Sequence, residues 1–133
     1  MIFLTALIPN SLFLGFSGVE LRKAKMINIL LVEDSKFLRL ATQRALAHAG
    51  YGLTGAGDGD EALRLAREQI PDLILLDLLL PKTSGLDVLK ALKQDSVTQA
   101  IPVVVRTGMA QKNAAWLEHD GAVGFLEDRK SVV

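Results

Sequence analysis

Three short aliphatic runs, at 27–32, 73–78 and 101–106, constrain the fold of this chain more than any other feature of its sequence. Such a run is typical of a strand that is buried on both faces, because a half-exposed strand would alternate apolar with polar residues. The segments between the runs carry apolar residues at helical spacing, as in 36–49. This alternation predicts an α/β fold in which helices cover both faces of a parallel sheet.

Turn and capping residues set the expected limits of each element. Strands are expected at 27–32, 51–56, 73–78, 101–106 and 123–126. Helices are expected over 36–49, from a cap at Asp58 to about Gln69, from a cap at Ser84 to about Lys93, and over 113–119. The sequence therefore predicts one domain with five strands, and it shows no internal repeat.

Composition excludes several classes of function. The chain has 133 residues, half of them apolar, which suits one domain with a substantial core. Lys plus Arg and Asp plus Glu number 15 each, so charge gives no support for nucleic acid or a membrane surface as a partner. The absence of Cys excludes disulfides and thiolate chemistry. His48 and His119 are isolated in the sequence, and both are expected on the surface of helices.

Residues 1–25 differ in character from the rest of the chain. They are mostly apolar at first, but Pro9, Asn10 and two glycines interrupt the apolar stretch, and a basic stretch follows before Met26. A membrane span needs about 20 uninterrupted apolar residues. We expect an N-terminal extension over 1–25, ahead of a domain over 26–133. A weak membrane anchor is the alternative.

Asp77 is the residue that most needs a functional explanation. It lies inside the apolar run LILLDLLL, whereas Asp72 follows Pro71 and can lie at the start of the strand. An unpaired carboxylate in a buried strand is costly unless a partner neutralises its charge. We therefore expect Asp77 to have a chemical role.

The ends of the expected strands gather further polar residues. The strand at 27–32 is followed by Glu33 and Asp34, and the strand at 101–106 is followed by Thr107. In a parallel sheet these residues meet Asp77 at the carboxyl edge, where binding sites form. Crowded carboxylates favour a hard divalent cation, of which Mg²⁺ is the best candidate. A carboxylate beside Mg²⁺ can attack a phosphoryl donor and form an acyl phosphate.

Four motifs follow one another along the chain: ILLVEDS at 29–35, PDLILLDLLLPKTSG at 71–85, IPVVVRTG at 101–108 and GAVGFL at 121–126. In this order and at this spacing they resemble the receiver domain of two-component response regulators, over residues 27–126. The resemblance implies a doubly wound, flavodoxin-like parallel sheet with strand order 2-1-3-4-5. It also implies a signalling module, not an enzyme, in the cytoplasm, which takes a phosphoryl group from a histidine kinase or a His-phosphotransfer protein.

The same resemblance assigns roles to individual residues. Asp77 would be the phosphoacceptor, and Mg²⁺ would be held by Glu33, Asp34, Asp77 and the backbone carbonyl of Leu79. Thr107 would be the switch residue that contacts the phosphoryl group, and Phe125 would be the aromatic switch position. The output would be binding of another protein, with no nucleic acid or membrane partner and with a homodimer as a possible form.

This sequence also departs from the family pattern. The family carries a Lys three residues after the aromatic switch position, and that count falls on Asp128, with Arg129 and Lys130 adjacent. Arg106 stands where an apolar residue is usual. The chain ends at Val133, so we expect the family's fifth helix to be missing or truncated.

Other interpretations remain open at this stage. Glu33 and Asp34 could be an ordinary polar strand end, with Asp34 capping the next helix, and Phe125 could be a plain core residue. A receiver that cannot be phosphorylated, serving as a scaffold or dimerisation module, is the main alternative function. A small phosphatase with an Asp nucleophile is a third, although Leu79 stands where its second Asp would be expected.

Overall fold

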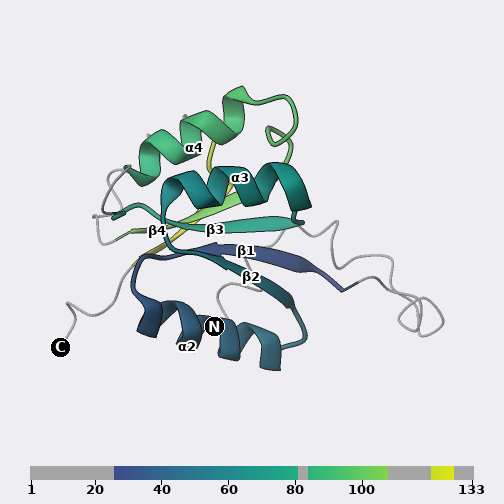
Figure 1. The fold of residues 1–133 in the computed structure, drawn as a ribbon, viewed down its shortest axis with the longest axis vertical. Helices are drawn as coiled ribbons and strands as arrows, with labels where there is room; N and C mark the ends of the chain where they lie inside the picture. The colour runs from purple at the N-terminus through teal and green to yellow at the C-terminus, as the bar shows by residue number, and fades with distance from the viewer. Residues whose placement is uncertain (1–25, 81–83, 108–120, 128–133) are drawn as a thin grey trace.

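The computed structural model describes residues 26–80, 84–107 and 121–127. Its centre is a five-stranded parallel sheet in the order β2-β1-β3-β4-β5. The strands are β1 (Asn28–Val32), β2 (Gly52–Ala56), β3 (Leu73–Asp77), β4 (Val103–Thr107) and β5 (Gly124–Glu127), and the helices are α2 (Lys36–His48), α3 (Gly59–Gln69) and α4 (Gly85–Gln94). Helix α2 covers one face of the sheet, and α3 and α4 cover the other (Figure 1).

The strands divide their side chains between two hydrophobic cores. On the α3–α4 face, buried residues such as Val32, Leu76 and Val105 pack with the inner sides of these two helices. On the α2 face, a smaller cluster includes Leu75 and Val104, packed with Leu46 of α2 and other residues. Because successive side chains along a strand point to opposite faces, the face of any other residue in the same strand follows from its position relative to these core residues.

Side-chain caps begin the helices where the sequence places Ser or Asp. The Ser35 hydroxyl accepts a hydrogen bond from the Leu38 N–H, Asp58 accepts from Glu61, and Ser84 accepts from Leu86. The caps expected at Asp58 and Ser84 are confirmed. The alternative role of Asp34 as a helix cap is wrong, because Ser35 is the N-cap of α2.

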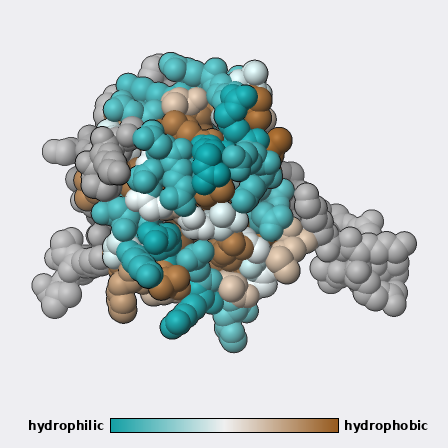
Figure 2. All heavy atoms as spheres, viewed as in Figure 1, coloured by the Kyte–Doolittle hydropathy of each residue, from teal (hydrophilic) through white to brown (hydrophobic). Residues whose placement is uncertain are grey.

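The apolar spacing in 36–49 predicted the helix correctly but not the burial of its side chains. Leu46 is buried, whereas Phe37 is 79% exposed. Figure 2 shows the molecule in the same view, with hydrophilic atoms over much of the α3–α4 side and hydrophobic atoms in scattered patches. Spacing therefore identified a helix but not which part of it contacts the core.

The fold class and the strand order expected from the sequence are confirmed. The expected helix at 113–119, the extension at 1–25 and the fifth helix fall outside the described residues, as do His119 and Asp128. His48 is exposed in the last turn of α2, as expected. None of the helices described here is long and apolar enough to cross a membrane.

Candidate functional site

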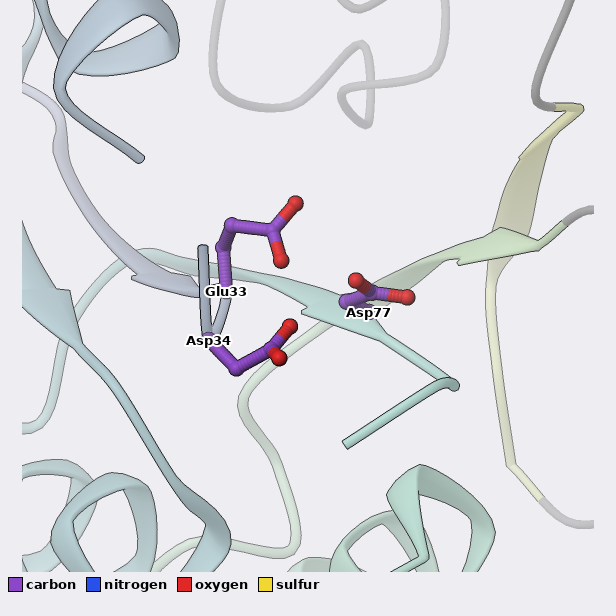
Figure 3. Close-up of side chains that lie close together, drawn as sticks. All are labelled: Glu33, Asp34 and Asp77. Atoms are coloured by element: carbon purple, nitrogen blue, oxygen red, sulfur yellow. The ribbon is translucent and has the colours of Figure 1, made fainter. Parts of the chain in front are cut away.

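Three carboxylates meet at the carboxyl edge of the sheet. Glu33 and Asp34 follow β1, and Asp77 ends β3, the neighbouring strand in which Leu76 lies opposite Val32. One carboxylate oxygen from each residue lies within 4.8 Å of the others. Figure 3 shows the three side chains gathered beside the ends of the two strands. The prediction that sequence-distant acidic residues converge here is confirmed in its geometry.

Glu33 is the most buried member of this carboxylate cluster, with 2% of its surface exposed. Burial raises the pKa of Glu33 to about 7, and hydrogen bonds with Asp77 and Asp34 and the charge of Asp77 act in the same direction. The Ser35 backbone N–H, 3.3 Å from Glu33 Oε2, acts against this rise. The negative charge of the three carboxylates is therefore only partly offset by the groups around them.

Arg106 provides a cation at the site, a role that its position in the sequence does not predict. Its Nη1 atom lies 3.1 Å from Glu33 Oε1, and the pair is largely buried, with 23% of the arginine side chain and 3% of the glutamate side chain exposed. A guanidinium beside Glu33 favours the ionised carboxylate and so opposes the effect of burial. The signal in the sequence was a charged residue at the end of a run of buried valines.

Leu78, Leu79 and Gly85 lie close to Asp77. The Leu79 N–H donates to Asp77 Oδ1 at 3.0 Å, and the Gly85 N–H donates to the Leu78 carbonyl at 3.1 Å. A Cβ atom on Gly85 would lie 2.5 Å from the Asp77 carbonyl oxygen and even closer to the Leu78 Cα. Glycine at position 85 is therefore a steric requirement of this arrangement, which orients the Asp77 carboxylate.

The other residues named from the sequence are placed only in part. Thr107 ends β4 next to Arg106, and Phe125 lies in β5 opposite Val105 of β4, but the side chains of Thr107 and Phe125 fall outside the description. The Leu79 side chain is 70% exposed. The roles of Thr107 and Phe125 as switch residues and of the Leu79 carbonyl as a ligand remain predictions.

The carboxylate cluster fits the chemistry of a hard divalent cation. Mg²⁺ prefers oxygen ligands and commonly takes one or two carboxylates while it retains several waters. Glu33, Asp34 and Asp77 supply three converging oxygens, and a cation among them would offset the charge of Asp77, which adds to the effect of burial in raising the pKa of Glu33. These residues therefore suit Mg²⁺ better than a softer metal, which would favour Cys or His.

Comparison with known proteins identifies the family. Residues 29–129, which include the carboxylate cluster, most of β1 and the other four strands, match the response regulator receiver domain. The chain belongs to this family. Receiver domains are modules of two-component signalling and not enzymes in the usual sense, and binding of Mg²⁺ at an acidic pocket is typical of them.

Several curated proteins are similar in sequence. A putative transcriptional regulator of Pseudomonas aeruginosa is 35% identical over 108 residues, which is 80% of this chain and 52% of that protein. The receiver spans about a third of the probable transcriptional regulatory protein TcrX of Mycobacterium tuberculosis, at 40% identity over 61% of this chain. The polar-differentiation response regulator DivK of Brucella anthropi is 41% identical over 64% of this chain and 69% of that protein.

Solved structures of response regulators share the fold. The chemotaxis response regulator CheY4 of Vibrio cholerae superposes with a TM-score of 0.73 and 30% identity, over 78% of this chain and 88% of that chain. The Mn²⁺-bound form of response regulator Rcp1 gives a TM-score of 0.68 and 33% identity, over 77% and 81% of the two chains. The receiver fold expected from the sequence motifs is thus confirmed.

Proposed function

We propose that this receiver accepts a phosphoryl group on Asp77 from a histidine kinase or a His-phosphotransfer protein, and that it signals by binding another protein. The observation that carries the proposal is the position of Asp77. It ends the central strand β3, with one oxygen within 4.8 Å of oxygens from Glu33 and Asp34. A carboxylate in this place is a nucleophile with charged neighbours, and a purely structural role would leave the cluster uncompensated.

The proposed reaction is a simple displacement. An Asp77 carboxylate oxygen attacks the phosphorus of a phosphohistidine and forms a P–O bond. The P–N bond breaks, and the electron pair stays on the imidazole nitrogen, which takes up a proton. The Leu79 N–H, bound to Asp77 Oδ1 at 3.0 Å, leaves Oδ2 as the oxygen more available for attack.

Mg²⁺ would be held by Glu33, Asp34, Asp77 and the Leu79 carbonyl, and it would supply charge neutralisation for the transferring group. The Mn²⁺-bound state of the similar regulator Rcp1 supports a divalent cation as the cofactor. Within the domain proposed over 26–133, Thr107 would then bind a phosphoryl oxygen, and Phe125 would move with it. The binding surface for a downstream protein would include β5 and the segment 113–119.

Acetyl phosphate tests the proposal directly. The chain is incubated with Mg²⁺ and acetyl phosphate, and the modified residue is located by mass spectrometry after borohydride reduction. We expect one phosphoryl group, at Asp77, and none in Asp77→Asn. Asp72→Asn is the matched control, since it changes the other aspartate of the same apolar run and should label like the parent. Modification elsewhere, or none in the parent, would refute the proposal.

One observation favours the alternative of a receiver that is not phosphorylated. Arg106 already pairs with Glu33, and Asp128 stands where the family carries a Lys. In a scaffold of this kind Arg106 would stay paired with Glu33 permanently and would offset part of the negative charge of the cluster without a metal. It predicts normal folding and oligomeric state in Asp77→Asn and no adduct with acetyl phosphate or beryllofluoride in the parent.

A further inference from the structure

Three residues, two from adjacent strands and one that directly follows a third strand, lie in one row at the site. Asp77 and Arg106 are register partners in the β3–β4 pair. The β1–β3 pairing aligns Val32 with Leu76, so the next residues, Glu33 and Asp77, continue side by side. Register partners in a parallel sheet point to the same face, here the α2 face. The order of side chains along the row is therefore Glu33, Asp77 and Arg106, with the proposed phosphoacceptor Asp77 in the middle.

The ion pair spans this row. Arg106 belongs to β4, and its Nη1 atom reaches Glu33 Oε1, which belongs to the segment after β1. Since β3 lies between these strands, the arginine side chain crosses β3 at the level of Asp77. A guanidinium in this position is already beside the place where a group bound to Asp77 would project.

The guanidinium has capacity for further acceptors. It carries five N–H donors in a planar fork, and in the described residues one hydrogen bond, to Glu33, is formed. The described part of the chain contains two other ion pairs, Arg64–Glu68 and Arg67–Asp95, and in both the arginine is more than half exposed. Of the three arginines in these ion pairs, Arg106 is thus the one that is mostly buried. Charge-assisted hydrogen bonds are stronger in such surroundings than at the surface.

We propose that Arg106 is a phosphoryl-binding residue that pairs with Glu33 in the resting receiver and transfers to the phosphoryl oxygens once Asp77 is modified. This rests on the proposed phosphorylation of Asp77. A dianionic phosphoryl group on Asp77 would lie between Glu33 and Arg106 and would compete with Glu33 for the guanidinium. Two phosphoryl oxygens can accept two parallel hydrogen bonds from the guanidinium, whereas a single carboxylate oxygen of Glu33 cannot. The transfer leaves Glu33 to the metal, so modification and metal binding reinforce each other.

This exchange predicts that Arg106→Gln affects the two ligands, Mg²⁺ and beryllofluoride, differently. Without modification, loss of the competing cation leaves Mg²⁺ binding unchanged or tighter. With Mg²⁺ saturating, beryllofluoride binding at Asp77 weakens roughly ten- to a hundred-fold, the value of one lost charge-assisted hydrogen bond or two. A merely structural role for Arg106 would weaken both together, since a distorted site holds neither ligand well.

The experiment measures Mg²⁺ and beryllofluoride affinities by calorimetry and fluorine NMR on the parent, Arg106→Gln, Arg106→Lys and Arg67→Gln. Arg67→Gln is the matched control because it removes the arginine of the exposed pair with Asp95. We expect Arg106→Lys, which keeps the charge without the fork, to fall between parent and Arg106→Gln.

Two results would overturn the inference while the proposed function stands. One is an Arg106→Gln protein that binds beryllofluoride as tightly as the parent. The other is a variant that loses both ligands in parallel, with Arg106→Lys no better than Arg106→Gln. A parent chain that forms no adduct would instead overturn the proposed function, and this inference with it.

Discussion

Asp72 and Asn28 exchange two hydrogen bonds across the starts of β3 and β1. The Asn28 N–H donates to Asp72 Oδ2 at 2.8 Å, and the Asp72 N–H donates to the Asn28 carbonyl at 2.9 Å. Asp77 lies at the opposite end of the same strand, within the carboxylate cluster. The two aspartates of one apolar run therefore do different things: one aligns two strands, and the other faces the site.

Asp72→Ala should destabilise the fold without affecting the site. The substitution removes the acceptor for the Asn28 N–H, and an exposed hydrogen bond of this kind is worth roughly 0.5–1 kcal/mol. We expect a loss of that size in the free energy of unfolding measured with urea, with acetyl phosphate labelling at Asp77 unchanged. A variant as stable as the parent would show that the side-chain bond contributes nothing.

Mg²⁺ should stabilise the folded chain, because the carboxylate cluster exists only in the native state. Ligand at a hundred times its dissociation constant adds about 2.7 kcal/mol. Asp34→Asn should reduce the rise in melting temperature that Mg²⁺ produces, and without metal it should melt higher than the parent because one repelling charge is gone. Glu68→Gln also removes one acidic charge, near the far end of α3, and should respond to Mg²⁺ like the parent. A melting curve indifferent to millimolar Mg²⁺ contradicts the metal assignment.

The raised pKa of Glu33 predicts an unusual dependence of stability on pH in the absence of metal. The pKa is about 7 in the folded chain against 4.5 for an unperturbed glutamate, so between these values the native state holds a proton that the unfolded chain has released. Stability contributed by this group should therefore fall as pH rises from about 4.5 to about 7 and level off above.

Unfolding by urea in a chelating buffer, at several pH values, measures this effect. Glu33→Gln should flatten the fall, because the amide does not titrate, and saturating Mg²⁺ should flatten it in the parent. A parent whose stability rises steadily over this range would contradict the assignment of the proton to Glu33.

Gly85→Ala should damage both stability and phosphorylation. The new methyl group would overlap the backbone of Leu78 and the Asp77 carbonyl oxygen, and backbone atoms cannot move aside as a side chain can. Overpacking of this kind costs about 1–3 kcal/mol. Gly57→Ala is the control, since its Cβ would meet only the end of the Arg39 side chain, at 3.4 Å. Equal stability of the two variants, measured by thermal melting, would show that the loop adapts freely.

Asp128→Lys tests whether the site lacks a cation. Replacing an anion by a cation near a dianionic phosphoryl mimic should strengthen beryllofluoride binding if position 128 approaches the site as the family pattern implies. We expect a small gain in the parent, where Arg106 already provides a cation, and a larger gain in Arg106→Gln. Affinities that Asp128→Lys leaves unchanged in both backgrounds would mean that Arg129 or Lys130 already fills the role, or that the assumed register is wrong.

The fold could be predicted from the sequence because its determinants are local. The aliphatic runs at 27–32 and 73–78 identify buried strands, and Asp58 and Ser84 begin helices through contacts with residues two or three positions ahead. The exposure of Phe37 could not be predicted in this way, because helical spacing shows that a helix has an apolar side but not what covers each of its turns.

The carboxylate cluster could also be predicted, since the ends of parallel strands meet at one edge of the sheet. The pairing of Arg106 with Glu33 could not. It depends on the relative register of β1, β3 and β4, and on a side chain long enough to cross the strand between. Register is set by long-range packing, so no single stretch of sequence contains it.

The alignment of Glu33, Asp77 and Arg106 on the α2 face also limits how the length of this chain can change in evolution. Inserting or deleting one residue within β4 would turn Arg106 to the α3–α4 face and bring a valine into its place, because successive strand residues alternate sides. A change of length in the connection at 95–102 leaves that alternation intact. Homologues should therefore differ by insertions and deletions in such connections, while the spacing between Val103 and Arg106 is kept.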